Sequence, residues 1–421
     1  MAIRYIIGDA RDGLRGLPAK SVHSVITSPP YWNLRDYSND PVLWGASPNC
    51  PHDFTFRTEE DYQRGWPCRC VGCGAWRGTL GNEPSPDLFI DHLCEVFDEV
   101  WRVLRDDGIL WVNLGDSYAG DAKWGGKSGG KNAGRHFPRK GSRSLSGVHP
   151  KELIGVPWAF AFAMRHCGWR LRQEIIWAKP NPMTESCEDR CVKAHEPIFM
   201  FTKAERYFYD YIAIQEPVSG GAHDRGAGSS PKDQGRDEKL VKSNERFRES
   251  TNDLTLTRNK RSVWTVSVAS YSGSHFAVFP PKLIEPCVLA STSEHGYCSC
   301  GSPWKRIIER DRVPTRPANE SKLSSVSGLN PRNPHEAQHG MIVGNRDPER
   351  HIAVKRTIGW EPTCRCEVPN LEGRGLILDP FAGSGTTGEV ASAAGLDAIL
   401  IDCNPEYSLL QKRRNAQGSL L

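Results

Sequence analysis

The sequence predicts an α/β protein with a doubly wound sheet, and two stretches at opposite ends of the chain carry this prediction. The apolar runs at 3–9 and 22–28 are typical of short buried strands joined by a helix. Residues 375–407 predict a strand, a glycine-rich turn, a helix from about Thr386 to Ala394 and a second strand. Buried strands that alternate with helices indicate a mostly parallel sheet.

The middle of the chain supplies further elements. Apolar residues at helical spacing predict a helix that begins near Ser85 and ends at Asp107 and Gly108. A strand, a helix and two more strands are predicted at 109–117, 153–169, 170–180 and 196–203. The polar stretches 217–262 and 310–358 show no sustained apolar period, so we expect loops there.

Charge and composition indicate which partners and which cellular location to expect. The 421 residues carry a net charge of +4, too small by itself to indicate a polyanionic partner. Between Ala119 and Lys151, however, one acid, Asp121, stands among eight basic residues: Lys123, Lys127, Lys131, Arg135, Arg139, Lys140, Arg143 and Lys151. This segment predicts a mobile basic arm or a solvated linker. Since there is no run of 18 apolar residues and no signal peptide, we expect a cytoplasmic protein without a membrane span.

The stretch "TSPPYW" ends the second predicted strand. Proline lacks an N–H and fixes its own φ, so Pro29 and Pro30 stop the strand abruptly. The carbonyls of Ser28 and Pro29 are then rigid acceptors beside the ring of Tyr31. Such a group suits a planar ligand with hydrogen-bond donors, such as a nucleobase with its exocyclic amine. The alternative is an ordinary strand-to-loop turn with two core aromatics.

The stretch "DPFAGSGTTG" predicts a cofactor site. Gly383, Gly385 and Gly388 satisfy G-x-G-x-x-G, and Asp402 follows at the end of the next predicted strand, where a carboxylate can accept both hydroxyls of a ribose. A carboxylate at Asp379 would repel a pyrophosphate but would favour the sulfonium and ammonium groups of S-adenosylmethionine. No Gly-Lys-Ser/Thr follows these glycines, so the motif is not the P-loop of a nucleotidase. The chain that follows Gly388 is too short for the remaining strands of a dinucleotide fold, so upstream chain must complete the sheet.

The two motifs, in this order, resemble the beta-class, permuted amino-methyltransferases of DNA. "GDARDGLRGLP", "HFAVFPPKLIEPCVLAST" and "NPEY" extend the resemblance over most of the chain. It implies a Rossmann-like methyltransferase sheet with a circularly permuted motif order and with S-adenosylmethionine as methyl donor. The cofactor contacts that it implies come from Asp9, Ala10, Asp379, Pro380, Phe381, Gly383, Ser384, Gly385, Thr386 and Asp402.

The resemblance also implies a reaction. The catalytic residues would be Ser28, Pro29, Pro30 and Tyr31. Drawing both N–H bonds of the amine towards Ser28 and the Pro29 carbonyl would localise the nitrogen lone pair for direct attack on the methyl group. Tyr31 would stack on a base that has left the duplex. In the family, Ser before Pro-Pro accompanies cytosine N4 more often than adenine N6, so cytosine is favoured and adenine is the alternative.

Two other classes of protein share some of these sequence features. A zinc-bearing DNA-binding module with an inactive methyltransferase fold would explain the cysteines but not "DPFAGSG". A protein-glutamine methyltransferase is disfavoured because its glycine motif comes first and Asn replaces Ser. We expect double-stranded DNA as substrate and a cognate restriction endonuclease as a candidate partner. The sequence does not fix the oligomeric state, for which a homodimer is one candidate.

Fourteen cysteines in a chain without an export signal indicate metal sites or buried thiols rather than disulfides. One predicted zinc site consists of Cys50, His52, Cys70 and Cys73, with Cys68 as a spare or a substitute for His52. The second consists of Cys298, Cys300, Cys364 and Cys366. Four protein ligands leave no open position, so both sites are expected to be structural.

These assignments divide the chain into five parts. The catalytic half of the methyltransferase domain comprises 1–44 and 83–216, and the cofactor-binding half comprises 263–296 and 367–421. Zinc-binding insertions occupy 45–82 and 297–366, and a polar DNA-contacting region occupies 217–262.

Overall fold

The chain forms two compact units. The structure is a computed structural model that describes residues 2–34, 39–55, 68–119, 148–149, 151–185, 187–218, 254–268, 279–314 and 351–418. The first unit comprises Met1–Asp210, Arg261–Trp304 and Pro362–Leu421, and the second comprises Tyr211–Lys260 and Lys305–Glu361. Most of the predicted basic arm, and the interiors of 217–262 and 310–358, lie outside the described residues. In the part that is described, no helix is long and apolar enough to cross a membrane.

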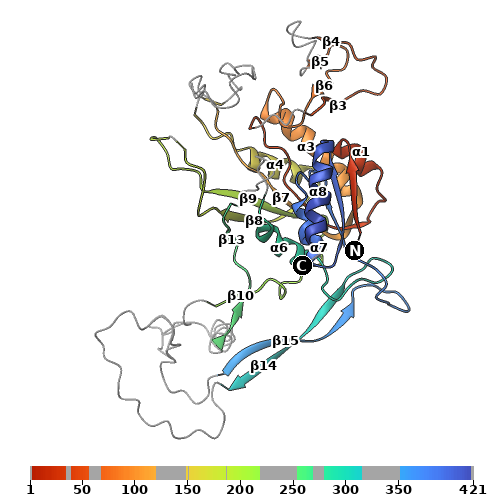
Figure 1. The fold of residues 1–421 in the computed structure, drawn as a ribbon, viewed down its shortest axis with the longest axis vertical. Helices are drawn as coiled ribbons and strands as arrows, with labels where there is room; N and C mark the ends of the chain where they lie inside the picture. Colours follow the sequence, from red (N-terminus) through yellow and green to blue (C-terminus); the bar gives the residue numbers. More distant parts are fainter. Residues whose placement is uncertain are drawn as a thin grey trace, which may run out of the picture. The chain divides into compact units, whose positions relative to one another are not determined.

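Within the described residues, an eight-stranded sheet forms the centre of the first unit (Figure 1). Its spatial order is β1 (Ile3–Ile7), β17 (Asp397–Asp402), β16 (Leu376–Asp379), β2 (Val22–Thr27), β7 (Leu104–Asn113), β9 (His195–Thr202), β8 (Arg170–Ala178) and β13 (Val263–Thr265). The strands from β1 to β7 are parallel, β9 is antiparallel to both neighbours, and β13 is parallel to β8. The predicted α/β class with a mostly parallel sheet is confirmed, and strands from the two ends of the chain lie side by side at its centre.

Helices cover both faces of this sheet. They are α1 (Ala10–Arg15), α3 (Pro86–Val103), α4 (Val156–His166), α6 (Pro281–Ser291), α7 (Thr386–Ala393) and α8 (Pro405–Gly418). A Cβ added at Gly13 of α1 would lie 2.8 Å from the Ile401 side chain, and one added at Gly388 of α7 would lie 2.8 Å from Leu400. Successive side chains of a strand point to opposite faces, so α1 and α7 pack on opposite sides of β17. Both glycines allow close helix–strand packing.

The end of α3 differs from the prediction. The helix ends at Val103, and Leu104, which is fully buried, already has an extended backbone as the first residue of β7. Val22 pairs with Leu104 and Ser24 with Ile109, so β7 has extra residues between these two pairs. The Asp107-Gly108 signal therefore marks a bulge inside the strand, not the end of the helix.

Two smaller sheets and a strand pair complete the fold. In the first unit, β3 (Val42–Trp44), β6 (Trp76–Gly78), β5 (Cys68–Cys70) and β4 (Phe54–Thr55) form a four-stranded antiparallel sheet. In the second unit, the strands are β11 (Leu254–Thr255), β15 (His351–Pro362), β14 (Trp304–Pro314), β10 (Glu216–Pro217) and β12 (Thr257–Arg258).

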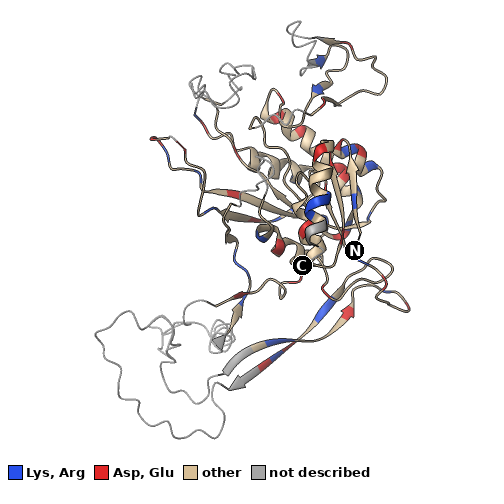
Figure 2. Ribbon diagram, in the orientation of Figure 1, with Lys and Arg blue, Asp and Glu red and all other residues tan. Residues whose placement is uncertain are grey.

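The second unit corrects the loop prediction for the two ends of 310–358. Strands β14 and β15 occupy those ends, and the coloured parts of both strands contain residues of both charges (Figure 2). Arg306 donates to Thr357 across the pair and its guanidinium lies 4.5 Å from the Trp360 ring centroid. These contacts join segments that are far apart in the sequence, so a search for local apolar periods does not detect the strands.

The close packing of Gly108 in the β7 bulge can be tested by substitution. A Cβ at this position would lie 2.8 Å from the backbone oxygen of His23 and 2.6 Å from the Leu104 side chain. Because the backbone of β2 is held in the sheet, it cannot move away without a cost in free energy. We expect Gly108→Ala to lower the free energy of unfolding by about 1–3 kcal/mol, measured by guanidinium denaturation.

Gly16→Ala is the matched control. Gly16 has a φ of −72°, and its nearest Cβ contact would be an ordinary 3.5 Å. Alanine there should be neutral or stabilising by up to about 1 kcal/mol. Equal midpoints for the two variants would contradict the bulge interpretation.

Candidate active site

A cavity opens where β1, β2, β16 and β17 end. It is lined by Asp9, Ala10, Ser28, Pro30, Asn39, Asp40, Val42, Trp44, Thr79, Leu80, Pro380, Phe381, Gly383, Ser384, Asp402, Cys403 and Tyr407. The proline motif and the glycine loop, which lie near opposite ends of the sequence, thus share one cavity. The carboxyl ends of parallel strands are where ligands bind in open α/β sheets.

Not every predicted site residue lines this cavity. Pro29, Tyr31, Asp379, Gly385 and Thr386 are not among the lining residues. Pro29, Asp379, Gly385 and Thr386 are buried, and Tyr31 is half-buried.

The glycine loop is shaped for a ligand to approach its backbone. Gly383 and Gly385 have φ values of +49° and +83°, which favour glycine. A Cβ built on Gly383 would meet no heavy atom within 4 Å, so open space lies beside this residue. Helix α8 holds the loop from behind: Gln411 Nε2 donates to the Gly383 carbonyl at 2.9 Å, and Arg414 donates to the Ser384 hydroxyl at 2.8 Å.

Asp402 ends β17 and reaches the glycine loop. Its Oδ2 accepts the Gly383 N–H at 2.7 Å, and its Oδ1 accepts the Asn404 N–H at 2.9 Å. Burial raises the pKa of Asp402 to about 6, although these two backbone donors oppose the shift. The carboxylate is therefore oriented by the backbone and still faces the cavity.

Asp379 does not line the cavity but connects the structural elements around it. The residue is 1% exposed, and its carboxylate accepts hydrogen bonds from the hydroxyls of Thr27 at 2.6 Å and Thr387 at 2.7 Å. The Phe381 N–H donates to the same carboxylate at 3.0 Å. Burial raises the pKa of Asp379 to about 6, against the effect of these three donors. The residue links the ends of β2 and β16 to the start of α7.

The loop that carries the proline motif is held in place. Strand β2 ends at Thr27, as the prolines predict. Beyond them, the Asn33 N–H donates to the Gly81 carbonyl at 2.7 Å, and the Trp32 indole donates to the Glu83 carbonyl at 3.1 Å. The chain that leaves the first cysteine excursion therefore fixes the motif from outside the sheet.

Asp9 is the N-cap of α1. Its Oδ1 accepts the backbone N–H of Arg11 at 3.0 Å and the Arg11 Nε–H at 2.9 Å. The Arg11 guanidinium in turn lies 3.6 Å from the ring centroid of Trp44, a cavity residue. This stack joins the start of α1 to the cavity wall.

Sequence reasoning missed several lining residues. The first cysteine excursion and its flanks contribute Asn39, Asp40, Val42, Trp44, Thr79 and Leu80. No motif marks them, because their place depends on how the small sheet packs. Cys403 and Tyr407 could have been found, since both follow Asp402 within "DCNPEY".

The structure brings the four residues of the first predicted metal site close to one another. One ligand atom from each of Cys50, His52, Cys70 and Cys73 lies within 4.8 Å of every other. Cys50 and Cys70 sulfurs are 3.5 Å apart, and Cys73 Sγ is 3.5 Å from His52 Nδ1. Tetrahedral zinc with Zn–S bonds of about 2.3 Å needs sulfurs about 3.8 Å apart, so the donor set fits zinc. The side chain of Cys68 lies outside the described part.

The second predicted cluster also comes together. Ligand atoms of Cys298, Cys300, Cys364 and Cys366 lie within 4.8 Å of one another, with Cys298 and Cys366 sulfurs 4.0 Å apart. A set of four thiols with this spacing suits a closed, structural zinc site.

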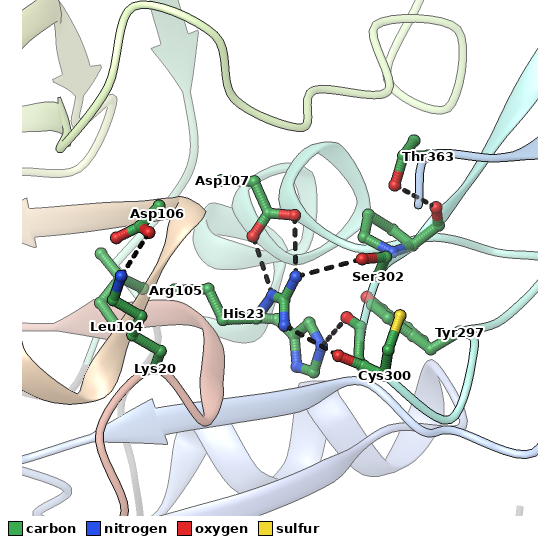
Figure 3. Close-up of polar contacts among 12 residues, drawn as sticks. Lys20, His23, Leu104, Arg105, Asp106, Asp107, Tyr297, Cys300, Ser302 and Thr363 are labelled. Atoms are coloured by element: carbon green, nitrogen blue, oxygen red, sulfur yellow. Dashed lines mark hydrogen bonds and ion pairs between the residues drawn. The ribbon is translucent and has the colours of Figure 1, made fainter. Parts of the chain in front are cut away.

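The loop of this second cluster docks on the central strands (Figure 3). Nδ1 of His23, on β2, accepts the Leu376 N–H of β16 at 3.0 Å, so Nε2 carries the proton and donates to the Gly301 carbonyl at 2.8 Å. Burial lowers the pKa of His23 to about 4, which keeps the ring neutral at physiological pH. Arg105 of β7, paired with Asp107, donates to the Cys300 carbonyl at 3.4 Å.

Comparisons with known proteins give consistent results. The sequence pattern of a family described as DNA methylase, N6_N4_Mtase, matches residues 22–299 and 368–413. The Type II methyltransferase M.XycI of Xanthomonas campestris pv. cyanopsidis is 37% identical over 290 residues, 69% of this chain and 73% of that protein. The Type II methyltransferase M.SmaI of Serratia marcescens is 30% identical over 412 residues, 98% of this chain and 90% of that protein.

Among solved structures, the PvuII DNA methyltransferase (cytosine-N4-specific) has a TM-score of 0.47 and 14% identity, with 98% of this chain and 86% of that chain covered. The family assignment does not depend on it. Because the family pattern matches well over half of the chain and both relatives align with more than two thirds of it, the chain belongs to the N6/N4 DNA methylase family and is a DNA methyltransferase.

Proposed function

We propose that the chain transfers a methyl group from S-adenosylmethionine to the exocyclic amine of a base flipped out of double-stranded DNA, with cytosine N4 as the target. One observation carries the proposal: Ser28 and Pro30 line the same cavity as Gly383 and Asp402. A methyl donor held by the glycine loop would then lie within reach of an amine held at the proline motif.

The cavity residues fit this cofactor. The ionised carboxylate of Asp402 would accept the ribose hydroxyls. Asp9, whose two described side-chain hydrogen bonds both use Oδ1, would accept the adenine amine through Oδ2. The open space beside Gly383 would admit the ribose and methionine portions. The cofactor supplies a methyl group on a sulfonium, and the chain supplies its orientation. Asp379, buried behind the loop, would act by holding Thr27 and Thr387 in register rather than by contact.

The proline motif would prepare the amine. The Ser28 hydroxyl and the Pro29 carbonyl would accept the two N–H groups of the amine, which localises the nitrogen lone pair. Pro29 and Pro30 would keep the backbone around these acceptors rigid. Tyr31 would stack on the base. The motif order along the chain, with β2 before β16 although the two are neighbours in the sheet, supports a circularly permuted methyltransferase fold.

The proline motif and the named relatives support a choice of target base and of partner. Ser28 before Pro-Pro favours cytosine N4 over adenine N6. M.XycI and M.SmaI are named Type II methyltransferases, which supports action at one specific DNA sequence and a partner restriction endonuclease. We also propose one zinc ion at each cysteine cluster, with a structural role.

The target base is tested directly. Plasmid DNA methylated by the purified chain, digested to nucleosides and analysed by mass spectrometry, should contain N4-methylcytosine. Ser28→Ala should lower kcat by about 100-fold, because it removes one of two acceptors for the amine, while the cofactor dissociation constant changes little.

N6-methyladenine in place of N4-methylcytosine would make adenine the target. No methylated base with the wild-type chain, at saturating cofactor and on DNA from several species, would refute the function. Ser299→Ala, on the exposed loop of the second cysteine cluster, is the control for Ser28→Ala and should keep wild-type kcat.

Cofactor affinity should depend on pH through Asp402. A raised pKa of about 6 means that the proton competes with the ribose hydroxyls below that value, so affinity falls as pH falls. We expect the dissociation constant for S-adenosylmethionine to be about tenfold higher at pH 5 than at pH 7, measured by calorimetry. Asp402→Asn should bind about 10- to 100-fold more weakly at pH 7, with little change towards pH 5.

Asp397→Asn, at the opposite end of the same strand, serves as the control and should retain the wild-type pH profile. A wild-type affinity that stays constant between pH 7 and pH 5 would argue against contact between Asp402 and the cofactor.

Metal content tests the two zinc sites separately. Elemental analysis of the chain purified with added zinc should find two ions per molecule. Cys73→Ser and Cys366→Ser should each retain one ion, because each removes one thiolate from one cluster only.

Cys191→Ser, which alters an exposed cysteine outside both clusters, should retain two ions. A wild-type chain without zinc, or an unchanged zinc count in both cluster variants, would overturn the assignment.

A further inference from the structure

A polar network surrounds the hydroxyl of Tyr31, outside the cofactor cavity. This hydroxyl lies 2.9 Å from Oε2 of Glu196 and 3.1 Å from Oδ1 of Asn113, so it can donate to either. Asn113 Nδ2 donates to the Pro197 carbonyl at 3.1 Å, which fixes the orientation of the amide. Oε1 of Glu196 is ion-paired with Lys179.

Regular structure holds each member of this network. Asn113 is the last residue of β7, Glu196 lies near the start of β9, and Lys179 follows directly after β8. These three strands are neighbours in the sheet, in the order β7, β9 and β8. A hydrogen bond to this site therefore ties the proline-motif loop to the sheet itself.

The charge pair is largely shielded from water. The side chains of Glu196 and Lys179 are each 16% exposed, and the Lys179 ammonium lies 4.1 Å from the ring centroid of Trp177. An ionised acceptor forms a stronger hydrogen bond than a neutral one, and low exposure limits its competition with water. A strong, directional bond at the Tyr31 hydroxyl results.

The ring of Tyr31 is also held on one side. A Cβ at Gly115 would lie 2.3 Å from Cε2 and 2.6 Å from Cδ2 of Tyr31, so the ring packs directly on the backbone of this glycine. The ring is thus fixed at its hydroxyl by Glu196 and at its edge by Gly115. These two contacts restrict rotation of the Tyr31 ring about its side-chain bonds.

We infer that Glu196, Asn113 and Lys179 are positioning residues that lock the ring of Tyr31 in the orientation needed to stack on the target base. The inference rests on the proposed function, in which Tyr31 stacks on the base whose amine is held at Ser28 and Pro29. Ring and acceptors lie on one short loop, so a displaced ring would displace the amine from the acceptors. A misplacement of about 1 Å can cost about 100-fold in rate.

Single-turnover methyl transfer tests this network. Tyr31→Phe keeps the ring but removes the hydroxyl, and we expect the rate to fall about tenfold. Glu196→Ala should lower it by about 100-fold. The dissociation constant for S-adenosylmethionine should stay within about twofold of wild type in both, since none of these residues lines the cofactor cavity.

A spectroscopic readout reports the stacking itself. With 2-aminopurine at the target position, emission is quenched when the extruded base stacks on an aromatic ring. We expect brighter emission from complexes of Tyr31→Phe and Glu196→Ala than from the wild-type complex, because a loosened ring stacks less of the time.

A rescue variant separates positioning from general damage. Glu196→Gln keeps an acceptor oxygen for Tyr31 but leaves the Lys179 ammonium without its charge partner. Combining it with Lys179→Met should recover most of the rate that Glu196→Gln loses. Glu99→Gln, which breaks a part-buried ion pair with Arg102 on α3, is the matched control and should retain the wild-type rate.

The outcomes are distinct. Wild-type rates and emission in Tyr31→Phe and Glu196→Ala would overturn the inference while leaving the proposed function intact. Loss of cofactor binding in Glu196→Ala would also overturn it, because the residue would then act on the fold as a whole. Absence of methyl transfer by the wild-type chain would refute the proposed function, and the inference with it.

Discussion

One buried carboxylate joins the two halves of the site. Asp379 ends β16 and accepts the hydroxyl of Thr27, the last residue of β2, at 2.6 Å. It also accepts the hydroxyl of Thr387 in the first turn of α7 at 2.7 Å. Because β16 and β2 are parallel neighbours that end together, the glycine loop and the proline motif leave the sheet side by side. Segments from opposite ends of the chain thereby share one cavity.

This arrangement has an electrostatic cost. Burial raises the pKa of both Asp379 and Asp402 to about 6, above the usual value of 3.8. Between these values the folded chain binds more protons than the unfolded chain, so the contribution of each group to stability is greatest below pH 3.8 and is lost as pH rises through 6. At neutral pH both carboxylates are ionised at the expense of stability. The N–H and O–H donors around the two carboxylates reduce this cost.

Local signals in the sequence predicted the parts of the site that depend on local backbone. Prolines ended β2 at Thr27, and the glycine spacing placed the cavity loop. Cysteine spacing also identified two groups whose ligand atoms come together. Long-range contacts were not predictable: Trp44 and Thr79 reach the cavity through the packing of a small sheet, and Glu196 meets Tyr31 from a distant part of the sequence. The Asp107-Gly108 signal was misleading because a bulge and a helix end favour the same residues.

Strand β2 is held at both of its ends by contacts with the two cysteine excursions. At its start, His23 donates to the carbonyl of Gly301, next to Cys300 of the second cluster. Past its end, Trp32 donates to the carbonyl of Glu83, where the first excursion rejoins the core. A strand fixed at two points and stopped by two prolines cannot slide along its neighbours without breaking one of these contacts. The proposed mechanism requires this rigidity, because acceptors that had to reorganise during the reaction would add to its barrier.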